Sequence, residues 1–437
     1  MKKIKALKWG VAIAAHQTEG AYDKDEKGLS IWDTFTQKSY KIKDRSNAKI
    51  ATDFYHRFEE DIDLAVDIGL QIFRFSVSWS RILPNGTGVV NPKGIEFYNK
   101  VINYCLKVGI EPWITTYHWD LPQKLQDKGG WTNRDSISWY AAYVTVLRNH
   151  FADRVQHWVL INEGIVCIGG GYFLGVHAPG KRGIRNFISS THHLLLAQAE
   201  GFKVLKKKEG LQVGTAISCT KIEPYRNTTA DHKAAIRIDT LMNRLFIEPY
   251  LGLGYPDNDF PTLKRISKYY KKGDIEALKT DFDFWGIQTY AREVVKAAWY
   301  IPYLGAIQVK PEKRNVKTSV MGWETYPEGV QYFLERFAKY NPKKTLWLSE
   351  CGIALSKNED DQKRIEYYQK IIEGMKTVLG KNINLKGILL WTLVDNFEWA
   401  EGYIPKFGII SLDRNTMQRK MKRSALWLKK YLLNIKL

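Results

Sequence analysis

The sequence predicts an α/β fold: a single (β/α)8 barrel, or TIM barrel, with elaborated loops after its strands. A unit of helix, glycine and strand recurs near the start, because Gly69 to Trp79 and Gly109 to Trp119 have the same spacing and lie 40 residues apart. Further strand-like segments follow, most of them separated by helical patterns. Parallel strands connected by helices produce this alternation.

The strand candidates are short apolar segments, eight in all. They cover residues 9–15, 72–79, 112–118, 158–162, 213–219, 284–290, 346–349 and 388–393. Eight parallel strands favour a closed barrel, and an open doubly wound sheet is the alternative. The barrel is favoured because the glycine run at 169–171 lacks a nucleotide-binding frame.

Helical patterns precede the second and third strand candidates. Apolar residues recur at helical spacing from Phe54 to Ile68, after a cap candidate at Asp53, and a second helix opens at Asn91-Pro92. In each case a glycine follows, which is typical of a left-handed helix end. Residues 140–151 and 365–379 show further helical patterns.

The chain has 437 residues, 44% of them hydrophobic and 26% charged, which excludes wholesale disorder. At roughly 150 residues per domain, a typical domain size, the chain is long enough for about three domains. No linker divides the chain, so we expect a single domain over 1–437. No apolar run of about 18 residues predicts a membrane span. The apolar stretch from Trp9 to Ala15 imitates a short secretion signal, but it leads directly into His16-Gln17, so we interpret it as a strand and loop.

The formal charge is +20, from 66 Lys and Arg against 46 Asp and Glu. Such an excess suits nucleic acid or an anionic surface, but the lysine clusters are scattered and no nucleic-acid module accompanies them, so we expect no specific nucleic-acid partner. Four scattered cysteines without a CxxC pair argue against disulfides and zinc and favour a reducing, cytoplasmic location. The histidines show no metal-ligand spacing, and we expect neither a metal nor a cofactor.

Two glutamates follow apolar strands directly. Glu163 comes after Trp158 to Asn162, and Glu350 comes after Thr345 to Ser349. A glutamate at such a position is either a salt-bridged residue of the barrel rim or a catalytic group, and for one residue alone the two readings are about equal. Two at matching strand ends favour catalysis, because paired carboxylates hydrolyse glycosidic bonds.

Other polar and aromatic residues are expected at the same end of the barrel. Amides, carboxylates, a histidine and tryptophans together suit a polyhydroxylated ligand, since sugar hydroxyls bind amides and carboxylates while sugar rings stack on tryptophan. These residues are Gln17, Glu19, Arg74, His118, Trp119, Asp120, Tyr290, Trp391, Glu398 and Trp399.

The chain resembles glycoside hydrolase family 1, the β-glucosidase family, from Trp9 to Leu432. The matching segments are residues 14–20, 74–84, 117–122, 162–163, 391–399 and 407–408. The resemblance implies a (β/α)8 barrel and a retaining, exo-acting β-glycosidase, foremost a β-glucosidase that releases glucose from β-glucosides or short oligosaccharides by double displacement. The implied partner is a small-molecule β-glycoside, and no oligomeric state is predicted.

The resemblance also implies residue roles. Glu163 would be the acid/base and Glu350 the nucleophile, with Arg74 and Tyr290 bound to Glu350. The implied substrate-binding residues are Gln17, His118, Trp119, Asn162, Gln288, Trp323, Trp391, Glu398, Trp399 and Phe407. Among them, Trp391 would lie beneath the sugar ring and Trp323 would support the leaving group. Relatives that cleave 6-phosphorylated sugars carry a serine and a nearby lysine and tyrosine in the loop of Glu398 and Trp399. Here a carboxylate would repel phosphate, so a neutral sugar is implied.

Four residues depart from the family pattern. Gly164 replaces a proline, and Gln288 replaces an asparagine. Around the nucleophile, Ser349 replaces a threonine and Cys351 replaces an asparagine. We expect Gly164 to loosen the acid/base loop and Gln288 to crowd the site, with activity retained. The alternatives are a sugar-binding barrel with impaired catalysis and a transglycosidase on the same site.

Overall fold

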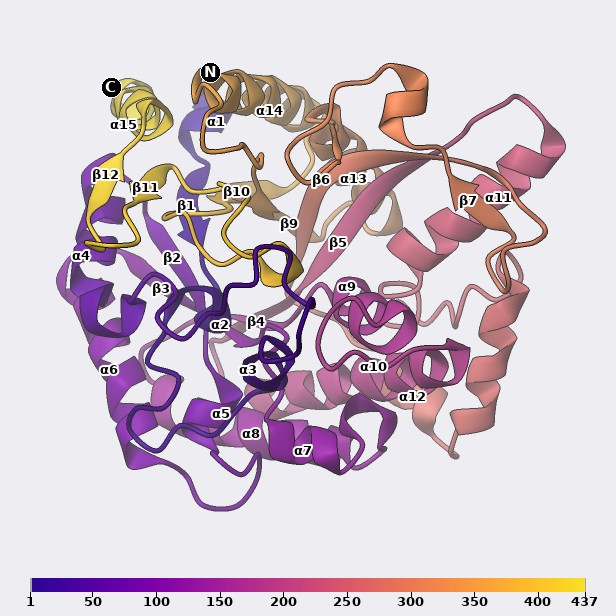
Figure 1. Cartoon of the computed structure of the whole chain (residues 1–437), viewed down its shortest axis with the longest axis horizontal. Helices are drawn as coiled ribbons and strands as arrows, with labels where there is room; N and C mark the ends of the chain where they lie inside the picture. The colour runs from indigo at the N-terminus through magenta and orange to yellow at the C-terminus, as the bar shows by residue number, and fades with distance from the viewer. Residues whose placement is uncertain (1, 437) are drawn as a thin grey trace.

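The computed structural model, which describes residues 2–436, is built around a closed barrel of parallel strands (Figure 1). Neighbours pair in the order β5, β4, β3, β2, β1, β10, β9 and β6, and pairing of β6 with β5 closes the barrel. Its strands are β1 (Lys8–Ala12), β2 (Ile72–Ser76), β3 (Glu111–Tyr117), β4 (His157–Asn162), β5 (Gln212–Pro224), β6 (Phe284–Ala297), β9 (Thr345–Cys351) and β10 (Leu385–Leu390). The predicted (β/α)8 barrel is confirmed, and the open-sheet alternative is wrong.

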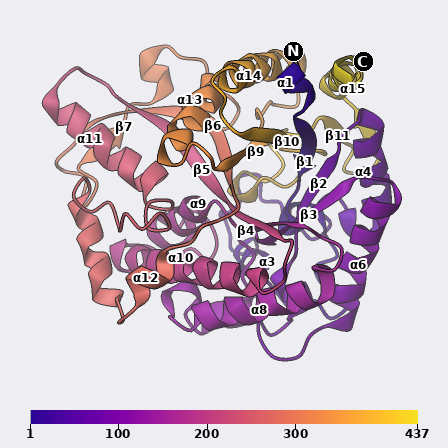
Figure 2. The same ribbon diagram turned by 180° about the vertical axis from the view of Figure 1, so that it is seen from behind.

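Helices surround the strands in both views (Figures 1 and 2). The longer ones are α4 (Phe54–Ile68), α6 (Pro92–Lys107), α8 (Ser136–Phe151), α10 (Ile184–Lys206), α11 (Thr229–Asp239), α13 (Glu328–Tyr340), α14 (Gln362–Gly380) and α15 (Arg423–Lys436). The two ends of the chain lie side by side, because α1 (Lys2–Lys5) contacts α14 and α15.

Shorter elements occupy the connections. The helical ones are α2 (Ala15–Thr18), α3 (Ile31–Phe35), α5 (Trp79–Ile82), α7 (Gln123–Asp127), η1 (Gly130–Thr132), α9 (Gly164–Ile168), η2 (Gly169–Leu174), η3 (Thr240–Arg244), η4 (Pro261–Tyr269), α12 (Asp274–Leu278), η5 (Pro311–Arg314) and η6 (Trp399–Glu401). The strands are β7 (Ala306–Gln308), β8 (Glu324–Thr325), β11 (Ile410–Leu412) and β12 (Arg419–Met421).

The predicted helix ends are largely confirmed. The Asn91 side chain accepts the Lys93 N–H at 3.1 Å at the start of α6, and Gly69, at φ +93°, ends α4. Asp53 precedes α4, but its side chain caps no backbone N–H; it faces His56 and Arg57 instead. The left-handed backbone of Asp53 accounts for this difference, since a capping residue normally has an extended backbone.

Both faces of the barrel strands are buried, and alternate residues face opposite sides. In β2, Ile72 lies in the cluster that fills the barrel, whereas Phe73 and Phe75 pack in the cluster between strands and helices. The interior cluster includes Trp113, whose ring stacks on His157 with centroids 4.3 Å apart. Arg74, on the interior side of β2, therefore lies inside the barrel.

Strands β5 and β6 extend well beyond their predicted ends at residues 219 and 290. They continue to pair from Lys221 with Arg292 to Pro224 with Val295. Charged residues along this extension interrupt the apolar pattern that would indicate a strand. In the structure such residues pair across the two strands, and Arg292 donates to Glu223 at 3.0 Å. Helix α11 and β7 cover the apolar side.

The described residues contain no helix that is long and apolar enough to cross a membrane. All four cysteines are buried and unpaired.

We predict that Trp113→Ala lowers the free energy of unfolding by about 3–5 kcal/mol, because it leaves a cavity in the barrel interior. Trp299→Ala is the matched control, since Trp299 is 93% exposed, and it should change stability by less than about 0.5 kcal/mol. Denaturant unfolding of both variants checks this. Equal losses would contradict the assignment of Trp113 to the core.

Candidate active site

A cavity of about 350 Å³ lies at the carboxyl ends of the barrel strands, where (β/α)8 enzymes place their active sites. Most of the predicted site residues line it, namely His118, Trp119, Glu163, Tyr290, Trp323, Glu350, Trp391, Glu398, Trp399 and Phe407. The four others, Gln17, Arg74, Asn162 and Gln288, are buried and hydrogen-bonded to residues of the cavity wall. The structure thus brings these residues together. Glu19 and Asp120, which were also expected at this end of the barrel, do not line the cavity. Both are buried, and Glu19 instead pairs with Arg81 at 3.0 Å.

The two glutamates reach the cavity from different elements. Glu350 lies within β9, near its end, whereas Glu163 follows β4 and precedes α9. The backbone of Glu163 is left-handed, with φ of +46°, and its N–H donates to the Ala216 carbonyl at 2.9 Å. This uncommon conformation turns the chain sharply between strand and helix and directs Glu163 toward the cavity.

Glu350 is held by two donors. The Arg74 guanidinium donates to Oε1 at 3.0 Å, and the Tyr290 hydroxyl donates to Oε2 at 2.8 Å. Burial raises the pKa of Glu350, while the charge of Arg74 and the hydrogen bond from Tyr290 oppose that rise. Both oxygens are therefore bound in a way that favours the ionised carboxylate.

Glu163 has a different environment. Burial first, and then the negative charge of Glu350, raise the pKa of Glu163 to about 8. The Ser218 hydroxyl is its hydrogen-bond partner, and Oε1 has no partner among the described residues. Of the two carboxyls, Glu163 is therefore the one favoured to hold a proton near neutral pH, whereas the neighbours of Glu350 stabilise its ionised form.

Asn162 has a defined amide orientation. Its Oδ1 accepts from Arg74 at 2.7 Å and from Gln288 at 2.9 Å, so its Nδ2 faces His118 Nε2 at 3.0 Å. His118 Nε2 must then be the acceptor. Burial, and next the charge of Arg74, hold the pKa of His118 well below its usual value, so the ring is neutral with its proton on Nδ1.

Several buried polar atoms around the cavity lack partners within residues 2–436. They are Glu163 Oε1, His118 Nδ1 and Gln17 Oε1. Gln17 also donates through Nε2 to Glu398 Oε2 at 3.3 Å, and burial raises the pKa of Glu398 to about 8. Buried polar atoms normally find partners, so this set indicates a ligand that offers several hydroxyl groups.

Aromatic rings form the remaining wall. Trp399 lies 4.6 Å from Trp32 and 4.5 Å from Trp119, measured between ring centroids. Trp391 is 3% exposed, whereas Trp323 is 39% exposed, with its centroid 6.0 Å from Tyr290. The cavity thus has a buried aromatic side and a solvent-accessible aromatic side.

The residues that depart from the family pattern are packed tightly. Gly164 does not loosen its loop as expected: a Cβ there would lie 2.7 Å from the Phe246 ring, so the glycine permits close packing. Gln288 is fully buried and is not part of the cavity wall; it donates to Asn162 and Glu350. Gln288 therefore does not crowd the cavity as expected, because its side chain forms hydrogen bonds behind the cavity wall.

Some lining residues were missed by the sequence reasoning. They are Val166, His177, Ser218, Cys219, Thr220, Met242, Ala291, Glu293, Met321, Ala400 and Glu401. Ser218 lies next to the end of a predicted strand, and that position was a usable signal. Glu293 lies on the unpredicted extension of β6. The charged residues that line the cavity in the described part of the chain are all glutamates, without lysine or arginine.

Comparisons with known proteins agree with this geometry. The sequence profile described as Glycosyl hydrolase family 1 matches residues 4–435. The chain is 39% identical to the 1,4-beta-D-glucan glucohydrolase of Thermotoga neapolitana, covering 98% of this chain and 97% of that protein. It is 38% identical to beta-glucosidase A of Acetivibrio thermocellus, with the same coverage. The family 1 β-glucosidase of Thermotoga maritima in complex with isofagomine lactam superimposes with a TM-score of 0.93 at 36% identity, covering 99% of both chains.

We predict that Gly164→Ala destabilises the protein by about 1–3 kcal/mol, because the added methyl group meets the Phe246 ring. In a double-mutant cycle, Gly164→Ala with Phe246→Leu should cost less than the sum of the two single changes. Gly380→Ala is the control, since its Cβ meets nothing within 4 Å. Strictly additive losses would mean that Phe246 does not confine Gly164.

Proposed function

The chain belongs to glycosyl hydrolase family 1 and is a glycoside hydrolase; we propose that it is an exo-acting β-glucosidase, with β-glucosides or short oligosaccharides as substrates. The names of its relatives support glucose as the released sugar. Enzymes of this family retain the configuration of the anomeric carbon. The observation that carries the residue assignment is the contrast between Glu350, bound by Arg74 and Tyr290, and the proton-holding Glu163.

In the first step of the proposed reaction, the Glu350 carboxylate attacks the anomeric carbon and forms a glycosyl ester. The bond to the leaving oxygen breaks as Glu163 donates its proton to that oxygen. Arg74 and Tyr290 orient the attacking carboxylate. Because both donors bind Glu350 before substrate arrives, little rearrangement is required during the step.

In the second step, water attacks the anomeric carbon and Glu163 accepts its proton, which releases the sugar and restores the Glu350 carboxylate. The ester removes the charge of Glu350, which is the second cause of the raised pKa of Glu163. The pKa of Glu163 therefore falls in the intermediate, and the same group changes from acid to base.

The proposed sugar site uses the buried side of the cavity. His118 Nδ1–H donates to a hydroxyl, Gln17 Oε1 accepts from one, and Glu398 does both when it is protonated. Trp391 and Trp399 contact the ring, and the more exposed Trp323 supports the leaving group. A neutral sugar fits, because no lysine or arginine among the described lining residues is placed to bind a phosphate.

We also propose that residues 1–437 act as one catalytic domain in the cytosol. One barrel includes strands from β1 to β10, and α15 packs beside α1, so both ends of the chain belong to the same unit. Four buried, unpaired cysteines support a reducing compartment.

We predict that Glu350→Gln reduces hydrolysis of aryl β-glucosides by roughly 10³-fold or more, because the nucleophile is lost. Glu276→Gln, at an exposed glutamate on α12, is the matched control and should retain normal turnover. Proton NMR of the first-formed sugar should show the β-anomer. An α-anomer formed first, or near-normal turnover by Glu350→Gln, would exclude the nucleophile assignment.

Glu163 should determine the alkaline limit of activity. Its pKa of about 8 means that kcat/KM for the wild-type protein falls as pH rises through about 8, when the proton needed by the leaving group is lost. Glu163→Gln should lose this limb for a dinitrophenyl glucoside, whose leaving group departs without protonation. If the limb persists unchanged in Glu163→Gln, another group is responsible for it.

A further inference from the structure

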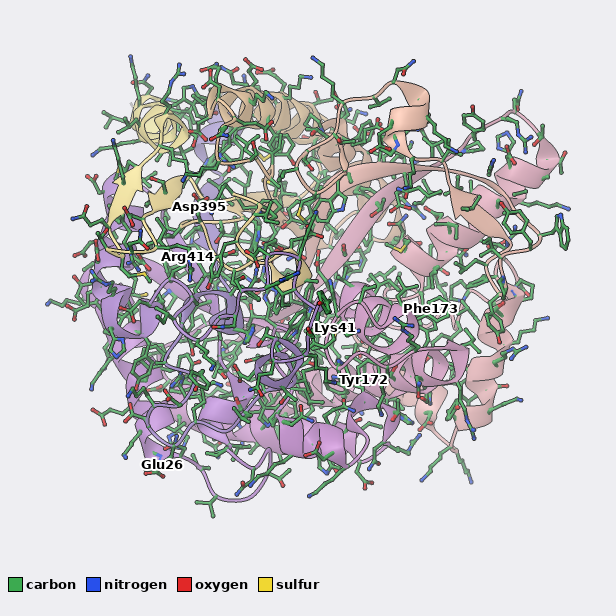
Figure 3. The ribbon with its side chains drawn as sticks, viewed as in Figure 1. Glu26, Lys41, Tyr172, Phe173, Asp395 and Arg414 are labelled. Atoms are coloured by element: carbon green, nitrogen blue, oxygen red, sulfur yellow. The ribbon has the colours of Figure 1, made fainter. Side chains whose placement is uncertain are left out.

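A second cavity, of about 510 Å³, lies apart from the catalytic cavity, and the two share no lining residue. Its wall comes from the segment between β9 and α14 and from the chain around β11 and β12. Asp395 and Arg414, two of its lining residues, are labelled close to each other beside β11 in Figure 3. We call it the Lys406 cavity, after the lysine on its wall.

The carboxylates of the Lys406 cavity already have partners. Asp361 pairs with Arg364 at 2.9 Å, and Asp395 pairs with Lys422 at 2.8 Å. Glu359 pairs with Lys363, which lies outside the cavity lining, at 2.9 Å. The fourth carboxylate, that of Asp413, accepts the backbone N–H groups of residues 415 and 416. Three of the four lining carboxylates are therefore paired with cations. Asp413 keeps its negative charge, and the charge of Lys357 is among the causes that lower the pKa of Asp413.

Three cations that line the cavity have no carboxylate within ion-pair distance among the described residues. Within residues 2–436, the ammonium groups of Lys357 and Lys406 make no hydrogen bond or ion pair. Arg414 donates to the Ala51 carbonyl at 3.1 Å and lies 3.3 Å above the centre of the Tyr403 ring. Lys406 is partly buried, so its charge is not fully solvated.

These cations influence one another. Burial lowers the pKa of Lys406, and the charges of Arg414 and Lys357 lower it further, against the attraction of Asp395 and Asp44. The charges of Arg414 and Lys357 therefore repel that of Lys406. An anion between them would remove that repulsion and accept charge-assisted hydrogen bonds.

We propose that the Lys406 cavity binds a phosphate group, either as free phosphate or as a small phosphate monoester. Phosphate carries about 1.5 to 2 negative charges near pH 7 and offers several acceptor oxygens, which suits three unpaired cations. Lys406, Lys357 and Arg414 are its ligands. The catalytic cavity, whose charged lining is glutamate, offers no such site.

The Lys406 cavity also lies where the backbone around Leu355 and the backbone around Lys406 are joined by hydrogen bonds. Lys406 N donates to the Leu355 carbonyl at 2.8 Å, and Leu355 N donates back at 3.1 Å. Arg364 donates to the carbonyls of Lys406 and Phe407 at 3.0 and 3.1 Å. The backbone around the bound phosphate is thus held in place before binding, which reduces the entropy lost when the ligand is ordered.

Titration calorimetry on the full chain tests the proposal, with inorganic phosphate and glycerol 3-phosphate as separate ligands at constant ionic strength. We expect one site per chain for at least one ligand. Lys406→Gln should weaken binding about tenfold, the usual effect of losing one charge-assisted hydrogen bond. Lys386→Gln is the matched control, since it removes the same charge from an exposed lysine outside the cavity and should leave the affinity unchanged.

Binding of both ligands supports recognition of the phosphate group itself, while binding of one alone identifies free phosphate or a monoester as the ligand. Lys357→Gln, at an exposed position, should also weaken binding and replaces Lys406→Gln if that variant does not fold. No binding of either ligand overturns the proposal. Equal weakening by Lys386→Gln overturns it too, because the net charge of the chain would then explain the affinity.

Discussion

Arg74 places a positive charge inside the barrel, and the proposed catalytic site is arranged around it. Its guanidinium donates to Glu350, Asn162, the Thr115 hydroxyl and the Ser349 carbonyl. A buried cation is costly unless its donors are satisfied, and buried carboxylates are costly unless a cation lies near. Arg74 meets both requirements at once, because it stabilises Glu350 and fixes the amide of Asn162. The orientation of His118 follows from that amide, so the nucleophile and part of the sugar site depend on the same guanidinium.

The contrast between the two glutamates follows from what surrounds each of them. Burial raises the pKa of both, but Glu350 has a cation and a hydroxyl bound to its oxygens, whereas Glu163 has the negative charge of Glu350 nearby. One residue type thus supplies an acid and a nucleophile in one cavity. The proposed reaction also links their states, because formation of the ester on Glu350 removes a charge that raises the pKa of Glu163.

Charge is distributed unevenly over the molecule. The chain carries a net charge of +20, yet the catalytic cavity has glutamates and no lysine or arginine among its described lining residues. Many lysines form exposed ion pairs, such as Lys100 with Glu96 and Lys429 with Asp67, and these contribute little to stability. The Lys406 cavity differs because three of its lining cations have no ion-pair partner within residues 2–436, while three of its four lining carboxylates pair with other cations. A local excess of this kind indicates an anion site more directly than the net charge does.

The sequence by itself determined the barrel, its eight strands and most residues of the proposed site. The spacing of apolar residues, the glycines that end helices and the polar residues at strand ends are local signals. Tertiary structure decided the rest. The extensions of β5 and β6 were hidden by charges that pair only across strands, as Arg292 does with Glu223. The sequence predicted that Gly164 loosens the loop that carries Glu163. In the structure Phe246, which is distant in the sequence, packs against Gly164. The pKa difference between Glu163 and Glu350, and the unpaired cations of the Lys406 cavity, likewise depend on which groups lie close in space. Those contacts join residues distant along the chain, so local sequence patterns do not contain them.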